Sequence, residues 1–165
     1  MLPTTFLNQV NEHFEGFCAL SDENLKGMAL DLGFEAQRDG KIPPLLVRGF
    51  AMVKAASKRH LGMEHYPVQL TGGRAMCLGH VIEMGTGEGK TLTATLPLFI
   101  NALAGRGALL ATANDYLAKR DAYEMQRVFH ALGMTVGVVQ SEMSRTQRRA
   151  AYGCSVTYGL SLIHI

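Results

Sequence analysis

Residues 81–91 read Val-Ile-Glu-Met-Gly-Thr-Gly-Glu-Gly-Lys-Thr, a short apolar run followed by a glycine-rich turn and a Lys-Thr pair. Glycines at alternate positions leave out the Cβ atoms that would block a tight turn, so successive backbone N–H groups can point inward at phosphate oxygens. Lys90 then reaches the β- and γ-phosphates as a mobile positive charge, and the Thr91 hydroxyl is suited to ligate Mg²⁺. The stretch therefore predicts a P-loop that binds ATP with magnesium.

The pattern departs in one place from the common Gly-x-x-x-x-Gly-Lys-[Ser/Thr] form, because Met84 stands at its first glycine. It matches the helicase-type variant, in which a small or apolar residue precedes x-Thr-Gly-x-Gly-Lys-Thr. A strand at 81–84 and a helix at 90–104 are the context that the mechanism requires. The predicted phosphate-binding residues are Gly85, Thr86, Gly87, Glu88, Gly89, Lys90 and Thr91. Glu88 is interpreted as part of the loop and not as a general base, because a second negative charge beside phosphates is unfavourable.

Apolar β-prone runs alternate with helical stretches on both sides of this motif. Further strands are expected at 108–112, 134–139 and 155–158, and a helix at 115–132 with Asn114 as N-cap and Gly133 as C-cap. This alternation is typical of a parallel sheet with crossover helices. We therefore predict an α/β fold with a helicase-like, RecA-type parallel sheet and flanking helices.

The first 61 residues have a different pattern, with apolar residues at helical spacing. Helices are expected at 5–19, at 21–38 and at 45–61, the third carrying the basic residues Lys54, Lys58, Arg59 and His60 on its outer face. The predicted organisation is an N-terminal helical segment at 1–61, a partial nucleotide-binding domain at 62–159 and a non-matching tail at 160–165.

Composition sets limits on the class of protein. With 47% hydrophobic and 18% charged residues, the chain is an ordinary globular one, and a net charge of +2 does not indicate a nucleic-acid partner. Three widely spaced cysteines fit a reducing compartment. The N-terminus lacks a basic region before an apolar core, and the longest apolar stretch, residues 92–103, is too short to cross a bilayer. The sequence predicts a soluble protein, at most peripheral to a membrane.

Several blocks outside the glycine-rich motif resemble the SecA family, the ATPase motors that drive preproteins through the bacterial Sec channel. They include Leu-Ser-Asp-Glu-Asn-Leu-Lys-Gly at 20–27, Ala-Ser-Lys-Arg at 56–59, His-Tyr-Pro-Val-Gln-Leu at 65–70, residues 83–97, Asn-Asp-Tyr-Leu-Ala-Lys-Arg-Asp-Ala at 114–122, and Thr-Tyr-Gly at 157–159. The resemblance implies the SecYEG channel, preproteins and an anionic lipid surface as partners, and a cytoplasmic protein that associates with the inner membrane. It implies no nucleic-acid partner.

The resemblance also implies how the base of ATP is bound. Gln69 would read the adenine edge, with Met63 and Tyr66 bordering the base. A carboxamide offers one donor and one acceptor, which suit N6 and N7 of adenine but not O6 of guanine. Without the resemblance, Gln69 is equally well interpreted as a surface helix residue. In the block at 114–122 the residues themselves indicate an N-cap followed by an exposed charged turn, Lys119, Arg120 and Asp121, to which no catalytic role is assigned.

Two features depart from the SecA pattern. Gly85 stands where the family commonly has arginine, so one positive charge near the triphosphate is lost. After Gly159 the family continues to an acidic pair that holds the magnesium shell and orients water, whereas this sequence reads Leu-Ser-Leu-Ile-His-Ile. ATP binding with negligible turnover is therefore expected. In P-loop motors later strands lie beside the P-loop strand, so an unpaired sheet edge is also expected.

Two other interpretations remain open at this level. The P-loop variant and domain plan are shared with nucleic-acid helicases, although an aromatic-studded basic surface is not evident in the sequence. The second alternative is that the chain is a structural remnant whose P-loop holds no nucleotide.

Overall fold

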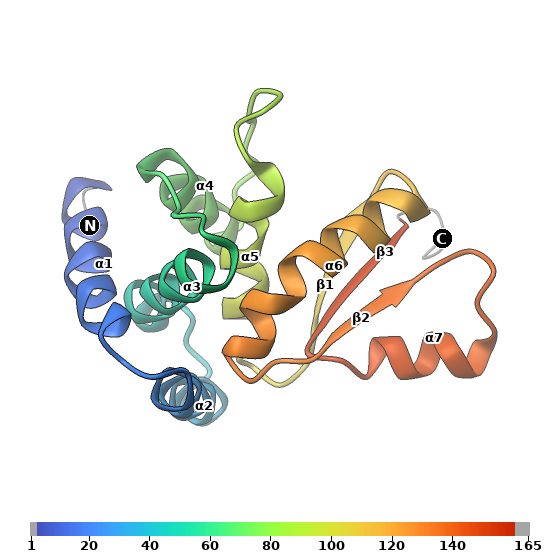
Figure 1. Ribbon diagram of the computed structural model, residues 1–165, viewed down its shortest axis with the longest axis horizontal. Coiled ribbons are helices and arrows are strands. Elements are labelled where there is room, and N and C mark those ends of the chain that lie inside the picture. The colour runs from blue at the N-terminus through green and yellow to red at the C-terminus, as the bar shows by residue number, and fades with distance from the viewer. Residues whose placement is uncertain (1–2, 161–165) are drawn as a thin grey trace.

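The computed structural model describes residues 3–160, which form a group of helices beside a small sheet, with a loop projecting between them (Figure 1). The helical part consists of α1 (Pro3–Cys18), α2 (Asp22–Asp39), the short 3-10 helix η1 (Pro43–Leu45), α3 (Leu46–Leu61), α4 (Pro67–Cys77) and α5 (Lys90–Ala102). From there the chain alternates through β1 (Ala108–Thr112), α6 (Asp115–Ala131), β2 (Val136–Val139), α7 (Arg145–Tyr152) and β3 (Val156–Leu160).

The three strands form a parallel sheet in the order β1-β3-β2, which confirms the predicted α/β class. In the central strand β3, neighbouring side chains point to opposite faces. The Thr157 hydroxyl donates a hydrogen bond to the Ala151 carbonyl of α7 at 2.9 Å. The Tyr158 ring is fully buried on the other face, where burial and the Asp121 carboxylate of α6 raise the pKa of its hydroxyl. Helices α6 and α7 therefore cover opposite faces of the sheet.

The predicted strand at 81–84 is not formed. These residues lie between α4 and α5 without strand pairing, and the Val81 side chain is fully exposed. A strand exists only through hydrogen bonds to a neighbouring strand. In the part of the chain that the structure describes, the sheet contains only β1, β3 and β2, and none of these pairs with residues 81–84. Despite their β-prone composition, residues 81–84 therefore form a connection between α4 and α5 without regular secondary structure.

The remaining predictions of helices and strands agree with the structure within a few residues. Ser21 caps α2 by accepting a hydrogen bond from the Asn24 amide, and Asn114 caps α6 in the same way through Leu117. Helix α6 ends one residue earlier than expected, with Leu132 as its C-cap. Two helices, α4 and α7, were not predicted from the sequence. Helix α7 begins at a capping box formed by Ser144 and Gln147, a signal that the sequence contains.

The expected outer basic face of α3 is wrong for Lys54. Its side chain is 5% exposed, donates to Asn11 Oδ1 at 2.7 Å, and forms an ion pair with Glu64 Oε1 at 3.1 Å. The ammonium group also lies 4.3 Å from the centre of the Phe14 ring. A buried ammonium is tolerated here because every side of it has a partner. Lys58 keeps the expected exposure and shares the same Glu64 carboxylate.

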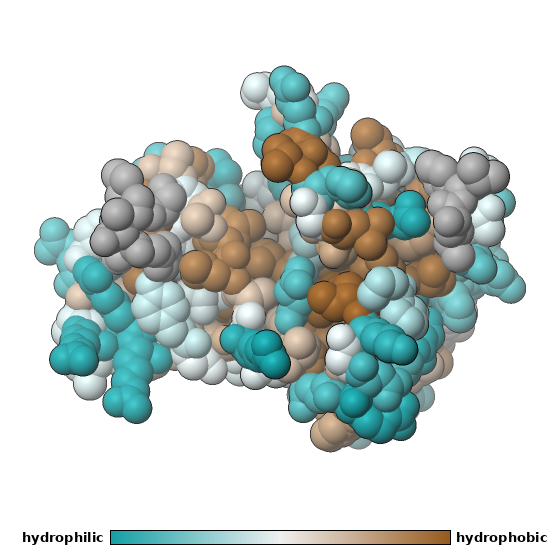
Figure 2. Space-filling model, turned by 180° about the vertical axis from the view of Figure 1, so that it is seen from behind, coloured by the Kyte–Doolittle hydropathy of each residue, from teal (hydrophilic) through white to brown (hydrophobic). Residues whose placement is uncertain are grey.

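Apolar side chains also gather on the face opposite to that in Figure 1, below the projecting loop (Figure 2). No helix within residues 3–160 is both long and apolar enough to cross a membrane.

Arg59 of α3 ties the end of α1 to the start of α2. Its Nη2 atom donates to the carbonyl of Leu20 at 2.7 Å and, over longer distances, to those of Phe17 and Cys18. Its Nη1 atom contacts Asp22 Oδ1 at 2.5 Å, and this hydrogen bond holds the pKa of the Asp22 carboxyl below its ordinary value. One side chain thus donates to carbonyl groups at the end of α1 and in its connection to α2.

We expect Arg59→Ala to lower the free energy of unfolding by about 1.5–3 kcal/mol, because charged hydrogen bonds to carbonyls between α1 and α2 are lost. Denaturation with urea measures this change. The control is Arg38→Ala, because Arg38 is exposed and forms its ion pair with its exposed neighbour Asp39. The control is expected to change stability by less than about 0.5 kcal/mol, and equal losses in the two variants would contradict the assignment.

Candidate functional site

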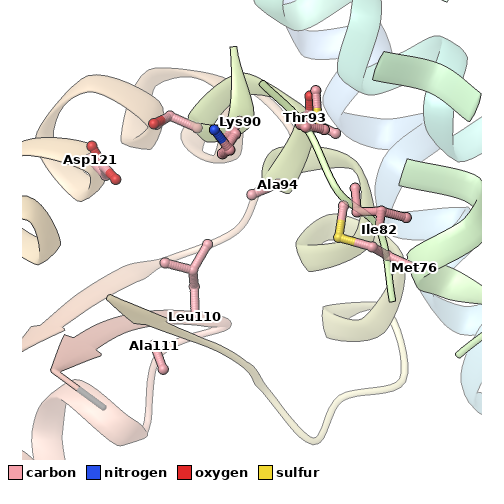
Figure 3. Close-up of a pocket in the computed structure, with 10 residues that line it drawn as sticks. Met76, Ile82, Lys90, Thr93, Ala94, Leu110, Ala111 and Asp121 are labelled. Atoms are coloured by element: carbon pink, nitrogen blue, oxygen red, sulfur yellow. The ribbon is translucent and has the colours of Figure 1, made fainter. Parts of the chain in front are cut away.

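A cavity of about 290 Å³ lies between the start of α5, strand β1 and helix α6. Lys90 and Asp121 lie on one side of it, across from Met76 and Ile82 (Figure 3). The other lining residues are Met84, Thr91, Thr93, Ala94, Leu110 and Ala111. The cavity therefore combines apolar walls with the predicted phosphate-binding lysine and the predicted metal-binding threonine.

The glycine loop, residues 84–91, enters α5 through two left-handed residues. Gly87 has φ 86° and Gly89 has φ 77°, values that side chains with a Cβ rarely adopt. Gly89 is the N-cap of α5, and its carbonyl accepts hydrogen bonds from the amide and hydroxyl of Thr93. The first turn of α5 therefore begins directly after the loop, so its free N–H groups and positive dipole end lie at the loop.

The loop's own side chains occupy part of its polar surface. Glu88 Oε2 accepts a hydrogen bond from the Gly85 amide at 2.6 Å, and Lys90 Nζ donates to the Gly85 carbonyl at 2.8 Å. The Glu88 carboxylate thus accepts a hydrogen bond from a backbone amide that was predicted to face phosphate. Glu88 and Lys90 are both exposed, so both contacts can exchange with a ligand.

Gln69, in the first turn of α4, is attached to this loop. Its Oε1 atom accepts from the Tyr66 amide at 2.9 Å, and its Nε2 atom donates to the Glu88 carbonyl at 3.0 Å. A Cβ added at Gly89 would lie 2.3 Å from Nε2, so only glycine allows this approach. Gln69 is 3% exposed, and the interpretation as a surface helix residue is therefore wrong.

The two residues expected to border the base are exposed and lie in the connection between α3 and α4. Met63 is 48% exposed and Tyr66 is 69% exposed. The Ser57 hydroxyl fixes the connection by donating to the Met63 carbonyl at 2.6 Å. Tyr66 is the residue directly before α4, so its backbone is held by Gln69 while its ring remains accessible.

His65 holds this connection against α5. Its Nε2 atom lies 3.1 Å from the Leu92 carbonyl and 3.3 Å from the Thr95 hydroxyl. The imidazole is 2% exposed, and burial lowers its pKa to about 4. His65 is therefore neutral near pH 7, and it was not singled out from the sequence, which contains no signal for a buried neutral histidine at this point.

Asp121 differs most from its expected place. Its expected exposure is wrong: within helix α6 it is 9% exposed, and it lines the same cavity as Lys90 and Thr91. The helical periodicity of residues 118–129 places it on the buried face. Asn114 caps the helix as predicted, and Lys119 and Arg120 are exposed as expected.

The arrangement is compatible with a nucleotide and a metal ion. The loop has two left-handed glycines directly before a helix N-terminus, a lysine beside it, and a threonine hydroxyl at the first turn of that helix. Among residues 3–160 no group of three or more His, Cys, Asp or Glu side chains could hold a metal ion alone. Mg²⁺ is commonly held by one or two protein groups together with phosphate oxygens, so the residues fit a metal that arrives with its nucleotide.

The fold and this loop define an α/β protein with a RecA-type parallel sheet, in which a glycine loop leads into a helix. The sequence model of the SecA DEAD-like domain matches residues 3–162, and the chain belongs to this family. The expected resemblance is thereby confirmed.

Curated relatives agree with this assignment. Protein translocase subunit SecA 2 of Streptomyces avermitilis is 47% identical over 151 residues, which make up 92% of this chain and 16% of that protein. SecA 2 of Rhodopirellula baltica is 46% identical over 93% of this chain and 23% of its own length. SecA of Frankia casuarinae is 50% identical over 92% of this chain and 15% of its own length. The chain thus spans less than a quarter of each of these relatives.

The burial of His65 predicts a loss of stability in acid. An unfolded histidine binds a proton near pH 6.5, whereas the folded chain keeps the imidazole neutral down to about pH 4. The contribution to stability is complete above about pH 6.5 and is lost as the pH falls through this window, by about 1.4 kcal/mol per pH unit. Urea denaturation across this range should show the decline, and His65→Gln should reduce its slope. The exposed His130 provides the control, because His130→Gln should leave the slope unchanged; equal slopes in wild type and His65→Gln would contradict the prediction.

Proposed function

We propose that this chain is the ATP-binding part of a SecA-type motor, which couples ATP hydrolysis to the translocation of preproteins across the bacterial inner membrane. The observation that carries the proposal is the joining of three parts by short contacts: the glycine loop, Lys90 at the start of α5, and Gln69, whose amide donates to the loop at 3.0 Å. Membership of the SecA DEAD-like domain family and the translocase names of the relatives support it.

In this proposal the chain's own residues hold the triphosphate. The loop amides, including that of Gly85, would turn from internal partners to phosphate oxygens. Lys90 would release the Gly85 carbonyl for the β- and γ-phosphates, and Thr91 would ligate Mg²⁺. When bound, Mg²⁺ neutralises negative charge on the phosphates. Gly85 adds no side-chain charge, so the positive charge of the loop comes from Lys90 and the helix dipole.

Gln69 is proposed to read adenine while remaining attached to the loop. A carboxamide has two N–H donors and two acceptor lone pairs on its oxygen. The contacts with Glu88 and Tyr66 use one of each, which leaves one donor and one acceptor for the base. The exposed side chains of Met63 and Tyr66 would border the ring. The Gln69 side chain would then contact both the base and the Glu88 carbonyl of the loop.

The remaining features of the motor belong to this proposal as well. The partners would be the SecYEG channel, preproteins and the anionic surface of the inner membrane, with the protein otherwise in the cytoplasm. Residues 1–165 alone are proposed to bind ATP and to hydrolyse it poorly. A nucleic-acid helicase remains the alternative, but the relatives are named as translocase subunits and offer it no support.

Thermal unfolding with and without MgATP tests the proposal. A ligand that binds only the folded chain at about 100 times its Kd stabilises it by about 2.7 kcal/mol, which raises Tm by several degrees. GTP should give a smaller shift because its O6 does not suit the Gln69 amide. We expect Lys90→Ala to abolish most of the MgATP shift, whereas Lys119→Ala, which removes an equally exposed charge elsewhere, should retain it. Absence of any shift in the wild-type chain would overturn the proposal.

The contact between Glu88 and Gly85 generates a separate prediction. Glu88→Gln removes a negative charge from the place proposed for phosphate, so MgATP should bind about twofold to fivefold more tightly, as expected for roughly 0.3–1 kcal/mol at a helix N-terminus. Isothermal titration calorimetry gives the two dissociation constants. Glu83→Gln is the matched control, because Glu83 is exposed and lies outside the turn. Weaker binding by the Glu88 variant would show that the carboxylate supports the loop and does not compete with phosphate.

A further inference from the structure

One charged residue interrupts the apolar face of α6. The buried residues of this helix are Ala118, Asp121, Ala122, Met125, Val128 and Phe129, which share the core-facing side. Asp121 is the only ionisable member of this set, and it is 9% exposed. Burying a carboxylate costs several kcal/mol unless partners compensate. Its position therefore requires a physical explanation.

Arg120 compensates only part of this cost. Its Nε and Nη2 atoms both donate to the same carboxylate oxygen, Oδ1, at 2.9 and 2.6 Å. The second oxygen, Oδ2, accepts no hydrogen bond from residues 3–160. The buried Tyr158 hydroxyl, which lies close enough to interact electrostatically with Asp121, has no hydrogen-bond partner among these residues and does not supply one. Neighbouring residues on a helix point in different directions, so Arg120 must bend toward Asp121 to make this contact.

Asp121 lines the cavity that contains the proposed phosphate and metal groups. Lys90 and Thr91 line the same cavity of about 290 Å³ from the start of α5, and Figure 3 shows Lys90 and Asp121 on the same side of it. The other walls are apolar, so Asp121 is the one carboxylate among the lining residues. A carboxylate oxygen that faces a proposed Mg²⁺ site is chemically suited to accept hydrogen bonds from the water ligands that this ion retains.

We propose that Asp121 is a positioning residue for the metal, whose free oxygen binds a water ligand of the Mg²⁺ held by Thr91 and the nucleotide. This inference rests on the proposed ATP site and adds a residue to it from α6. Asp121 touches neither phosphate nor metal directly. Arg120 holds the carboxylate through Oδ1 alone, which leaves Oδ2 available to a ligand in the cavity. A purely structural ion pair would instead stabilise the helix without any influence on metal affinity.

The test separates binding of the metal from binding of the nucleotide. ADP serves as the nucleotide because it is not hydrolysed, and Mn²⁺ replaces Mg²⁺ because free Mn²⁺ is measured directly by electron paramagnetic resonance. The dissociation constant of ADP in EDTA and that of Mn²⁺ in the ADP complex are determined for the wild-type chain, Asp121→Asn and Glu124→Gln. Glu124 is the matched control, because it lies on the exposed side of the same helix.

We expect Asp121→Asn to weaken Mn²⁺ binding in the ADP complex about tenfold or more, as loss of an outer partner of a metal site does. Its affinity for ADP in EDTA should stay within about twofold of wild type, since only the metal is affected. Glu124→Gln should change neither constant. If Asp121→Asn does not fold, the double variant Arg120→Gln with Asp121→Leu removes the pair as a unit and continues the apolar face, and it should show the same selective loss.

Unchanged Mn²⁺ affinity in the folded Asp121 variant would overturn this inference and leave the proposed ATP site intact. An equal loss of ADP affinity in EDTA and of Mn²⁺ affinity would also overturn it, because it would show a general effect on the site. If the wild-type chain binds no ADP under either condition, the proposed function fails, and this inference fails with it.

Discussion

The close packing of α4 against α5 is the constraint on which the candidate site depends. A Cβ added at Gly73 would lie 2.8 Å from Leu96 Cδ1 and 3.3 Å from the Phe50 ring, so the two helices approach as closely as they do only because Gly73 has no side chain. Gln69 lies one helical turn before Gly73. The packing therefore places the Gln69 amide beside the Glu88 carbonyl. As a result α4, which contributes no residue to the glycine-rich motif, is hydrogen-bonded to that motif.

This attachment gives the loop a defined shape before any ligand is bound. Gly87 and Gly89 adopt left-handed backbone angles, Glu88 occupies the Gly85 amide, and Lys90 binds the Gly85 carbonyl. The amide and the carbonyl of Gly85 are thus satisfied by exposed contacts with charged side chains of the loop. In the proposed ATP complex these internal partners would be exchanged for ligand, so the energy of binding would reflect a difference between two sets of contacts.

The sheet side of the site is formed differently. Strand β3 is the central strand, buried on both faces by α6 and α7, while β1 presents one edge to the cavity beside the glycine loop. Residues 81–84 lie across this cavity without a strand partner. In P-loop motors later strands lie beside the P-loop strand, and such pairing would give these residues the hydrogen bonds that a strand requires.

The local pattern of the sequence was sufficient for most of the secondary structure and for the loop. Caps such as Ser21 and Asn114, the glycines of the turn, and the positions of Lys90 and Thr91 depend on residues a few positions apart, so the sequence alone determined them. The resemblance of several blocks to SecA was likewise readable in the sequence and is confirmed by the family match. The burial of Lys54, Gln69 and Asp121 could not be predicted from the sequence. Each depends on partners far away in the chain, and only the tertiary structure decides whether a polar side chain meets water, another group or a cavity.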